Sequence, residues 1–377
     1  MPNSKSDPSA TSLVCPHCGE TVQPVPMVFG MPGVTLFEEA EAGSVVLGGC
    51  VVSDDDPRWA CPACGGGLWN LSAPTLSERL AGGVWGHLVG DAVGVPYEGR
   101  PADEIGEVRF GAQGAHGQPP GTWSDDGALM LALLGSLLEA GFDTADQARR
   151  ALAWYRERHY TPDGDGHFDI GGATSTALYN FERGSPAEEA GPTAERRCGN
   201  GSLMRILPLA LVEHEVPVEA LVERAHRASR VTHGHPRPQV ACALYVLVAR
   251  GLLEGRLSRT LVMGEALLTL RALYESDRFT TEHRQALDHL EGWTERAGRG
   301  RVWDSFWSAW DAFAGADSYA EAIARAVGYG NDTDTTAAIA GGLAGIHWGI
   351  GGIPAEWLDG MRGREIVEPL VARLVSH

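Results

Sequence analysis

Two short acidic stretches stand at the starts of apolar segments that are expected to be buried. Residues 124–126, Ser-Asp-Asp, precede the run ALMLALLGSLL, and residues 331–336, NDTDTT, precede AAIAGGLAGI. One serine or aspartate at such a place is an ordinary helix cap, because its oxygen accepts a hydrogen bond from a free backbone amide. A cap uses one acceptor for each helix. The other buried carboxylates therefore need cations as partners.

The side chains in these two stretches indicate which cations they would hold. Hard oxygen ligands select magnesium, manganese or calcium, and four carboxylates carry about four negative charges, which two divalent ions balance. Two hydroxyl groups add neutral ligands. We therefore predict a two-metal site, with simple helix capping as the alternative. Its expected ligands are Ser124, Asp125, Asp126, Asp332, Asp334 and Thr335.

A second metal site is predicted near the N-terminus, in the repeated patterns CPHCG and CPACG. Each Cys-x-x-Cys turn lets two thiolates bind one ion, and the glycine that follows relieves the backbone. Two such turns complete the four-thiolate tetrahedron of structural zinc. A redox dithiol or two unrelated motifs are the alternatives, and Cys50, between the turns, has no partner. The predicted zinc ligands are Cys15, Cys18, Cys61 and Cys64.

The composition describes an ordinary globular chain. It has 377 residues, 44% of them hydrophobic and 21% charged, which allows a large core. The net charge of −19 argues against strong non-specific binding of nucleic acid. The N-terminal twelve residues hold no apolar stretch, and the longest strongly apolar run, about a dozen residues, is too short to cross a bilayer. We expect a cytoplasmic protein, in which the cysteines bind metals or pack in the core rather than form disulfides.

The pattern along the chain predicts two domains. Residues 1–72 form a small β-rich, zinc-ribbon-like module with a flexible N-terminal tail, and short strands with turns are expected between the two cysteine turns. Residues 73–377 form an all-α domain, because helical patterns alternate with loops and no convincing series of strands is found. Helices are predicted at 127–140, 145–158, 203–213, 217–230, 238–253, 259–275, 281–297, 318–328 and 335–347.

Two expected helices, residues 81–94 and 335–346, are rich in glycine and alanine. Small residues let helix backbones approach closely, at a cost in intrinsic helix stability. Such helices belong in the middle of a bundle. Asp332 and Asp334 would then stand at the entrance of a central helix.

The sequence motifs of this chain resemble those of the ADP-ribosylglycohydrolases, the family that includes the dinitrogenase reductase-activating glycohydrolase. Besides the two acidic stretches, five segments match in the family's order, and the resemblance covers roughly residues 78–360. It implies a compact orthogonal multi-helix bundle and leaves the cysteine-rich module outside. The five segments are GHLVGDAVGVPYEG (86–99), HFDIGGATSTAL (167–178), GNGSLMRILPLAL (199–211), THGHP (232–236) and IPAEW (353–357).

The resemblance implies how a ligand would be held. The six oxygen ligands would bind two magnesium or manganese ions, which would contact the vicinal hydroxyls of the distal ribose of ADP-ribose. The family usually has threonine where Ser124 stands, and both offer a hydroxyl. Backbone amides of a helix beginning near Ser202 would suit the diphosphate. Ribose and diphosphate contacts are expected from Asn200, Gly201, Ser202 and His233.

The resemblance also implies the catalytic groups. Asp169 matches an aspartate with a catalytic role in arginine-directed members, and Glu98 matches a glutamate on a mobile flap in serine-directed members. Cleaving a ribosyl bond develops positive charge at the anomeric carbon, and it needs an acid or a base beside that carbon. We expect Asp169 or Glu98 as the acid–base group and a metal-bound water as the nucleophile, with Asp126 both a metal ligand and part of the catalytic set.

The predicted function is hydrolysis of the glycosidic bond between ADP-ribose and an acceptor, with release of ADP-ribose. The FDIG segment favours ADP-ribosylated arginine on a protein, while serine, nucleic-acid and small-molecule acceptors remain open. The alternative, from a different functional class, is a non-catalytic, regulatory protein that binds ADP-ribose. Such a protein should have lost metal ligands, whereas all six positions here carry oxygen. The zinc module is expected to be a folding staple or, alternatively, a docking element.

Overall fold

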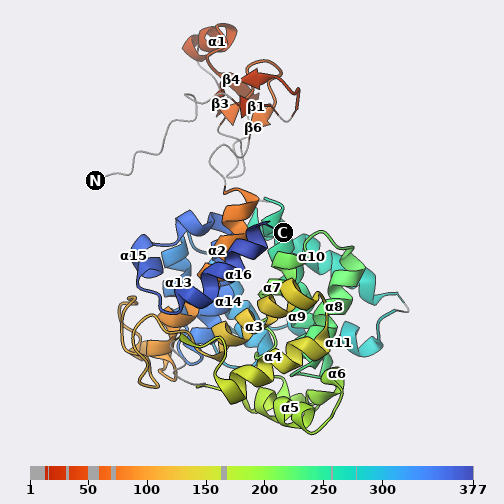
Figure 1. Ribbon diagram of the computed structural model, residues 1–377. Helices are drawn as coiled ribbons and strands as arrows, with labels where there is room; N and C mark the ends of the chain where they lie inside the picture. The colour runs from red at the N-terminus through yellow and green to blue at the C-terminus, as the bar shows by residue number, and fades with distance from the viewer. Residues whose placement is uncertain are drawn as a thin grey trace. The chain divides into compact units, whose positions relative to one another are not determined.

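The computed structural model describes residues 13–15, 17–30, 34–49, 59–68, 74–162, 168–255, 258–276 and 278–376 (Figure 1). The predicted N-terminal tail and Cys50 lie outside these residues. The chain divides into two compact units, an N-terminal unit of residues 1–74 and a helical unit of residues 75–377.

The N-terminal unit holds short strands, as the pattern predicts for a zinc-ribbon-like module. β1 pairs with β2, and a second sheet has the order β4-β3-β5-β6, in which only β3 and β4 run parallel. Helix α1, Val34–Glu41, connects those two strands and was not predicted. A parallel pair needs a crossover connection, and a helix commonly supplies it. The strands are β1 Leu13–Val14, β2 Thr21–Val22, β3 Val25–Phe29, β4 Val46–Gly49, β5 Trp59–Ala60 and β6 Gly67–Leu68.

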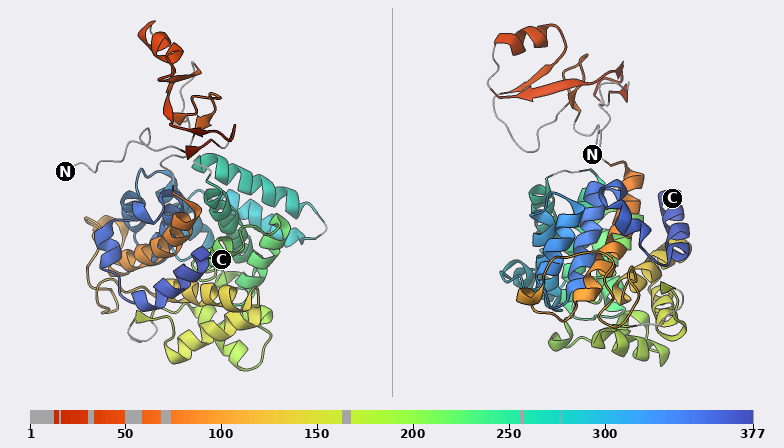
Figure 2. Two further views of the ribbon diagram at one scale, coloured as in Figure 1. Left: turned by 45° about the horizontal axis from the view of Figure 1, so that its top comes forward. Right: turned by 90° about the vertical axis from the view of Figure 1, so that its left-hand side faces the viewer.

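The described residues of the helical unit form helices joined by loops, which confirms the all-α prediction (Figure 2). Among all the described residues, no helix combines the length and the apolar character needed to cross a lipid bilayer. The helices are α2 Leu76–Gly94, α3 Asp125–Ala140, α4 Thr144–Glu157, α5 Gly172–Glu182, α6 Ala187–Ala190, α7 Leu207–Val212, α8 Val218–Arg230, α9 Pro236–Leu253, α10 Arg259–Tyr274, α11 Thr281–Glu291, α12 Val302–Ala314, α13 Tyr319–Gly328, α14 Thr333–Trp348, α15 Ala355–Asp359 and α16 Arg364–Ser376.

The glycine-rich helices α2 and α14 lie side by side and are almost wholly buried (Figures 1 and 2). A Cβ atom on Gly82 would lie 2.1 Å from the carbonyl oxygen of Gly345, and one on Gly94 would lie 2.4 Å from the Cα of Asp334. The two backbones touch because glycine has no side chain. This contact brings the end of α2 to the start of α14. The glycines of α2 that face α14 recur at Gly82, Gly86, Gly90 and Gly94.

Three predicted helix boundaries are wrong. The helix expected over 81–94 begins at Leu76, because Thr75 and Glu78 form a capping box at its N-terminus. The helix expected over 281–297 ends at Glu291, because Gly292 takes the C-cap position and the chain then continues without helical structure. The helix expected over 203–213 begins only at Leu207, so no helix starts near Ser202. Helices α5, α6, α12, α15 and α16 were not among the predicted ranges.

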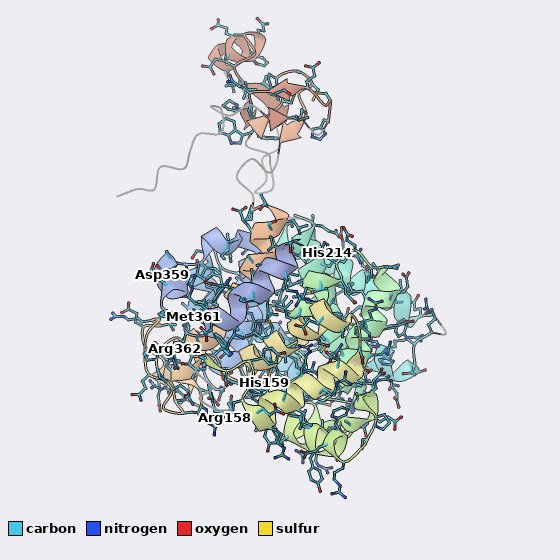
Figure 3. The ribbon with its side chains drawn as sticks, in the orientation of Figure 1. Arg158, His159, His214, Asp359, Met361 and Arg362 are labelled. Carbon is cyan, nitrogen blue, oxygen red and sulfur yellow. The ribbon has the colours of Figure 1, made fainter. Side chains whose placement is uncertain are left out.

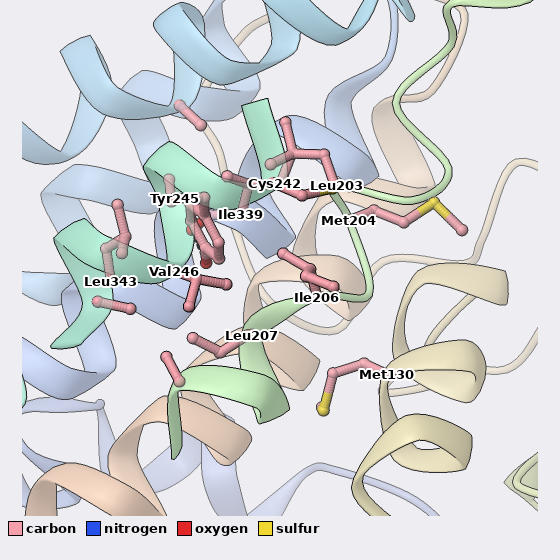
Figure 4. Packing of buried hydrophobic residues seen from close by; sticks show 14 of the residues in the cluster. Met130, Leu203, Met204, Ile206, Leu207, Cys242, Tyr245, Val246, Ile339 and Leu343 are labelled. Carbon is pink, nitrogen blue, oxygen red and sulfur yellow. Dashed lines mark hydrogen bonds between the residues drawn. The ribbon is translucent and has the colours of Figure 1, made fainter. Parts of the chain in front are cut away.

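The segment before α7 is held by the core. Leu203, Ile206 and Leu207 lie among side chains of α9 and α14 (Figure 4), and all three are fully buried. Beside them, the hydroxyl of Tyr245 on α9 donates a hydrogen bond of 3.0 Å to the carbonyl of Ile339 on α14. Packing of these apolar side chains, rather than a helix, therefore fixes the turn that carries residues 199–202.

Candidate active site

Residues 124–126 form the start of α3, and a residue of α2 fixes their backbone. Ser124 is the N-cap, and its hydroxyl accepts a hydrogen bond of 3.2 Å from the amide of Asp126. The buried carboxylate of Asp91 accepts hydrogen bonds from the amides of Ser124, at 2.9 Å, and Gly127, at 2.8 Å. The carboxylates of Asp125 and Asp126 are thus not needed as caps. The sequence analysis missed Asp91, for which the only signal is an acidic residue inside a glycine-rich apolar helix.

The turn before α3 is anchored from the far end of the chain. Arg362 donates hydrogen bonds to the hydroxyl of Thr122, at 2.8 Å, and to the carbonyl of Gly121, at 3.1 Å. Arg362 lies in the loop between α15 and α16 (Figure 3). Trp123 is fully buried, and its indole N–H donates to the carbonyl of Tyr160 at 2.9 Å. These contacts fix the approach to the acidic residues.

The start of α14 meets the start of α3. Thr335 donates a hydrogen bond of 3.3 Å to a carboxylate oxygen of Asp126. Asp332 stands at the N-cap position but makes no side-chain cap, and its carboxylate accepts a hydrogen bond of 2.8 Å from the amide of Asn200. Thr333 and Thr336 donate to main-chain carbonyl groups and have structural contacts. Residues from three distant segments therefore surround one cluster of carboxylates.

The buried carboxylates lack enough donors to satisfy them. Oδ1 of Asp126 and both carboxylate oxygens of Asp334 are buried without a hydrogen-bond partner among the described residues. Burial and neighbouring carboxylates raise the pKa of Asp125, Asp126 and Asp334 well above the ordinary value. No ion pair between described residues involves these groups. An all-oxygen set with unsatisfied acceptors fits hard divalent cations.

A cavity of about 580 Å³ opens on this cluster and is lined by Asp125, Asp126, Asp332 and Thr335. Asp334 is fully buried and is not part of the lining, so it lies behind the surface of the cavity. The other predicted site residues that line the cavity are Glu98, Asp169, Asn200, Gly201 and His233.

Like Asp334, Ser124 and Ser202 are predicted site residues that do not line the cavity. Ser124 touches the cluster through a contact of 3.2 Å to Asp126, outside the cavity lining. The hydroxyl of Ser202 is fully buried and accepts a hydrogen bond of 2.9 Å from Ser229. The structure therefore turns the Ser202 side chain into the core.

Glu98 and Asp169 face the cavity from two different segments. Asp169 has a φ of 57°, a left-handed conformation that is uncommon for a residue with a side chain. Burial, and next the charge of Glu98, raise the pKa of Asp169 to about 7. The main chain just after Glu98 is tied to the residues before α14, since the amide of Gly99 donates to the carbonyl of Asn331 at 2.7 Å.

His233 is held as a neutral side chain. Burial, together with the charge of Arg205, lowers its pKa to about 3. Its Nδ1 lies 3.0 Å from the hydroxyl of Thr232, which accepts a hydrogen bond of 2.8 Å from Arg205. A Cβ atom on Gly201 would lie 2.9 Å from the hydroxyl oxygen of Thr174 and 3.0 Å from the ring of His233, so a side chain here would displace these neighbours.

Basic residues also line the cavity, and the sequence analysis missed them. They come from two segments that are 105 positions apart in the chain. An isolated bridge between Gly199 and Arg301 joins these segments, and Arg301 also donates to the carbonyl of Arg196 at 3.1 Å. No local pattern signals such a pairing. The arginines in the lining are Arg196, Arg197, Arg299 and Arg301.

The four cysteines of the N-terminal unit converge as predicted. Their sulfur atoms all lie within 4.8 Å of one another, and the Cys15–Cys64 and Cys18–Cys61 distances are both 3.8 Å. A zinc tetrahedron with Zn–S bonds of about 2.3 Å has S–S edges of about 3.8 Å. The two turns share one design: in each, the glycine after the motif has positive φ and donates to the carbonyl of the first cysteine at 2.8 Å.

Comparison with known proteins identifies the family. The ADP-ribosylglycohydrolase family profile matches residues 72–377. The chain belongs to the ADP-ribosylglycohydrolase family. The match begins after the last cysteine of the N-terminal unit, so the cysteine-rich module lies outside it.

Comparison with individual proteins supports this family assignment. The chain is 28% identical over 295 residues to ADP-ribosyl-[dinitrogen reductase] glycohydrolase of Rhodospirillum rubrum, covering 77% of this chain and 92% of the relative. It is 27% identical over 327 residues to ADP-ribosylarginine hydrolase Tri1 of Pseudomonas putida (strain GB-1), covering 85% and 83%. A solved structure, an ADP-ribosylglycohydrolase-related protein complex, matches with a TM-score of 0.65 and 34% identity, covering 80% of this chain and 98% of that chain.

Proposed function

We propose that this protein is a divalent-cation-dependent hydrolase that cleaves the bond between ADP-ribose and an acceptor and releases ADP-ribose. One observation carries the proposal: buried carboxylate oxygens of Asp126 and Asp334 have no partner among the described residues, beside a cavity of about 580 Å³. This volume suits a small-molecule ligand. The names of two relatives, which contain dinitrogen reductase and arginine, favour ADP-ribosylated arginine on a protein as the substrate.

Two magnesium or manganese ions fit the donor set at the starts of α3 and α14. When bound, they neutralise the buried carboxylates and orient the ribose hydroxyls. Asp91 and Asn200 act from outside this set: Asp91 fixes the backbone of the α3 start, and the amide of Asn200 fixes Asp332. The ligands we propose are Ser124, Asp125, Asp126, Asp332, Asp334 and Thr335.

The rest of ADP-ribose would occupy the part of the cavity lined by residues 196–201 and 299–301. Guanidinium groups bind phosphate oxygens through charge-assisted, often paired hydrogen bonds. The arginine residues there match the two negative charges of the diphosphate. Gly201 leaves space beside the neutral ring of His233, which can contact the ligand without adding charge.

Hydrolysis breaks the bond between the anomeric carbon and the acceptor nitrogen, and a water oxygen forms the new bond to that carbon. A pKa raised to about 7 lets Asp169 carry a proton at neutral pH and give it to the leaving nitrogen. Glu98, on the same cavity, takes the proton that water loses. The negative charge of Glu98, and that of Asp169 once it has given up its proton, would also stabilise the positive charge that develops on the ribose.

A hydrolysis panel tests this function. The substrates are arginine-, serine- and nucleic-acid-linked ADP-ribose, offered to wild type and Asp332→Ala with magnesium or with a chelator. We expect release of ADP-ribose from the arginine-linked substrate, with loss of activity on chelation and in the variant. Tight binding of ADP-ribose without turnover of any substrate would instead establish a binding protein. Full activity of Asp332→Ala would disprove the two-metal site.

A further inference from the structure

His116 lies beside Glu98 and Asp169, but the proposed hydrolysis does not use it. Its Nε2 is 2.6 Å from Oε2 of Glu98, an ion-pair and hydrogen-bond distance. One ligand-type atom from each of Glu98, His116 and Asp169 lies within 4.8 Å of the others. His116 itself is not part of the cavity lining, so it contacts Glu98 from the side away from the ligand space.

His116 also reaches the segment that carries Asp169. Its ring packs against Phe168, the residue before Asp169, with ring centroids 5.5 Å apart. The loop of His116 is itself fixed to the end of α2, because the amide of Ala115 donates to the carbonyl of Val95 at 3.3 Å. One imidazole therefore connects both catalytic segments to a rigid support.

An ion bridging Glu98 and His116 does not explain this contact. Two ligand atoms at about 2.1 Å from one octahedral ion are about 3 Å apart. The observed 2.6 Å between Nε2 and Oε2 is shorter and fits a direct hydrogen bond. The glutamate side chain is flexible, and this hydrogen bond restricts the positions that the Glu98 carboxylate can take.

We propose that His116 is a positioning residue that holds the Glu98 carboxylate in place for proton transfer at the ribosyl bond. This inference rests on the proposed hydrolase function. A misplacement of about 1 Å at a reacting group costs about 100-fold in rate. Loss of His116 should thus lower kcat while leaving the ADP-ribose cavity intact.

The test compares His116→Ala with His116→Gln, whose amide nitrogen can still donate to Glu98. We expect kcat of His116→Ala to fall about 10- to 100-fold, with little change in KM or in the affinity for ADP-ribose. His116→Gln should recover part of the loss. The matched control is His159→Ala, because His159 pairs with Glu157 at 3.3 Å on the surface (Figure 3). Its kcat should equal that of wild type.

A double-mutant cycle shows through which carboxyl group His116 acts. On a Glu98→Gln background, the His116→Ala change should cost no further rate, whereas on an Asp169→Asn background its effect should remain. An equal loss on the Glu98→Gln and wild-type backgrounds would overturn the inference, as would full activity of His116→Ala. If wild type hydrolyses none of the linked substrates, the proposed function and this inference fail together. If wild type is active and His116→Ala is unaffected, only the inference fails.

Discussion

The aspartates at the site have different structural surroundings, which imply different roles. Asp91 accepts two backbone hydrogen bonds and fixes a turn, whereas Asp334 has both oxygens buried without a described donor. A carboxylate that is satisfied by amides stabilises local structure, while an unsatisfied buried carboxylate costs free energy until a cation binds. The environment of each aspartate, rather than its residue type, therefore distinguishes a structural aspartate from a proposed metal ligand.

This difference predicts opposite effects for Asp334→Asn. The change removes a buried, unsatisfied charge, so the metal-free protein should become more stable toward thermal unfolding. It also removes a predicted ligand, so magnesium affinity should fall and hydrolysis should drop about 100-fold or more. Calorimetric titration with magnesium and thermal unfolding in chelator measure the two effects. Asp359→Asn, at the exposed end of α15 (Figure 3), should change neither. Unchanged magnesium affinity in Asp334→Asn would contradict the assignment.

At the scale of elements, the site depends on one contact between two helices and on one packed turn. The touching backbones of α2 and α14 bring Asp91 and the α14 start to the same place. The 199–206 turn, held by its apolar side chains, brings Asn200 to Asp332 across 132 positions of the chain. The positions of the site residues therefore depend on close packing of these elements, and a small displacement of one element would shift them.

The α2–α14 contact predicts the effect of Gly90→Ala. A Cβ atom there would lie 2.2 Å from the carbonyl oxygen of Ala337, so the helices must separate. We expect a loss of about 1–3 kcal/mol in the free energy of unfolding, with reduced activity. The control Gly264→Ala, on α10, meets no atom within 4 Å and should gain up to about 1 kcal/mol from helix propensity. Denaturant unfolding distinguishes the two variants, and equal stability of both would refute the close contact.

The N-terminal unit predicts a separate metal dependence. Its buried apolar cluster consists only of Cys15, Val22 and Cys61, with Trp59 packed against it, among the described residues. So small a core needs a metal to fold. We expect about one zinc per chain, lost in Cys15→Ser together with the protease resistance of the two cysteine turns. Metal analysis and limited proteolysis measure both, with Cys242→Ser as the control that keeps zinc. A Cys15→Ser variant that retains zinc would rule out the four-cysteine site.

At the scale of the whole molecule, the charges that line the cavity differ from the net charge of the chain. The chain carries a net charge of −19, yet one cavity combines buried carboxylates with four arginines. Carboxylates gathered in a low-dielectric interior repel one another, and divalent cations remove this repulsion. We therefore expect the stability of the molecule to depend both on divalent metal and on pH.

This linkage predicts that magnesium stabilises the protein more at pH 8 than at pH 5. The pKa values of Asp91 and Asp169 are raised to about 7 in the folded state, mainly by burial. Carboxyl groups with raised folded pKa favour the metal-free fold below about pH 4, and that contribution is lost as pH rises toward about 7. Burial also raises the pKa of the proposed ligands Asp125, Asp126 and Asp334 well above the ordinary value. Magnesium would bind their ionised forms, so its stabilising effect should grow as the pH rises. Thermal unfolding with magnesium and with chelator at both pH values tests this. An equal increase in Tm at the two pH values would contradict it.

The sequence by itself determined the family, the all-α architecture, the acidic and cysteine motifs and the central position of the glycine-rich helices. Each of these is encoded by neighbouring residues, through helical spacing, small side chains or repeated ligand patterns. The tertiary structure alone decided that Asp91 supports the α3 start, that Ser202 turns into the core, that His116 contacts Glu98 and that separate arginines share one cavity. These pairings join segments far apart in the chain. Packing of the whole bundle determines them, and no local pattern records them.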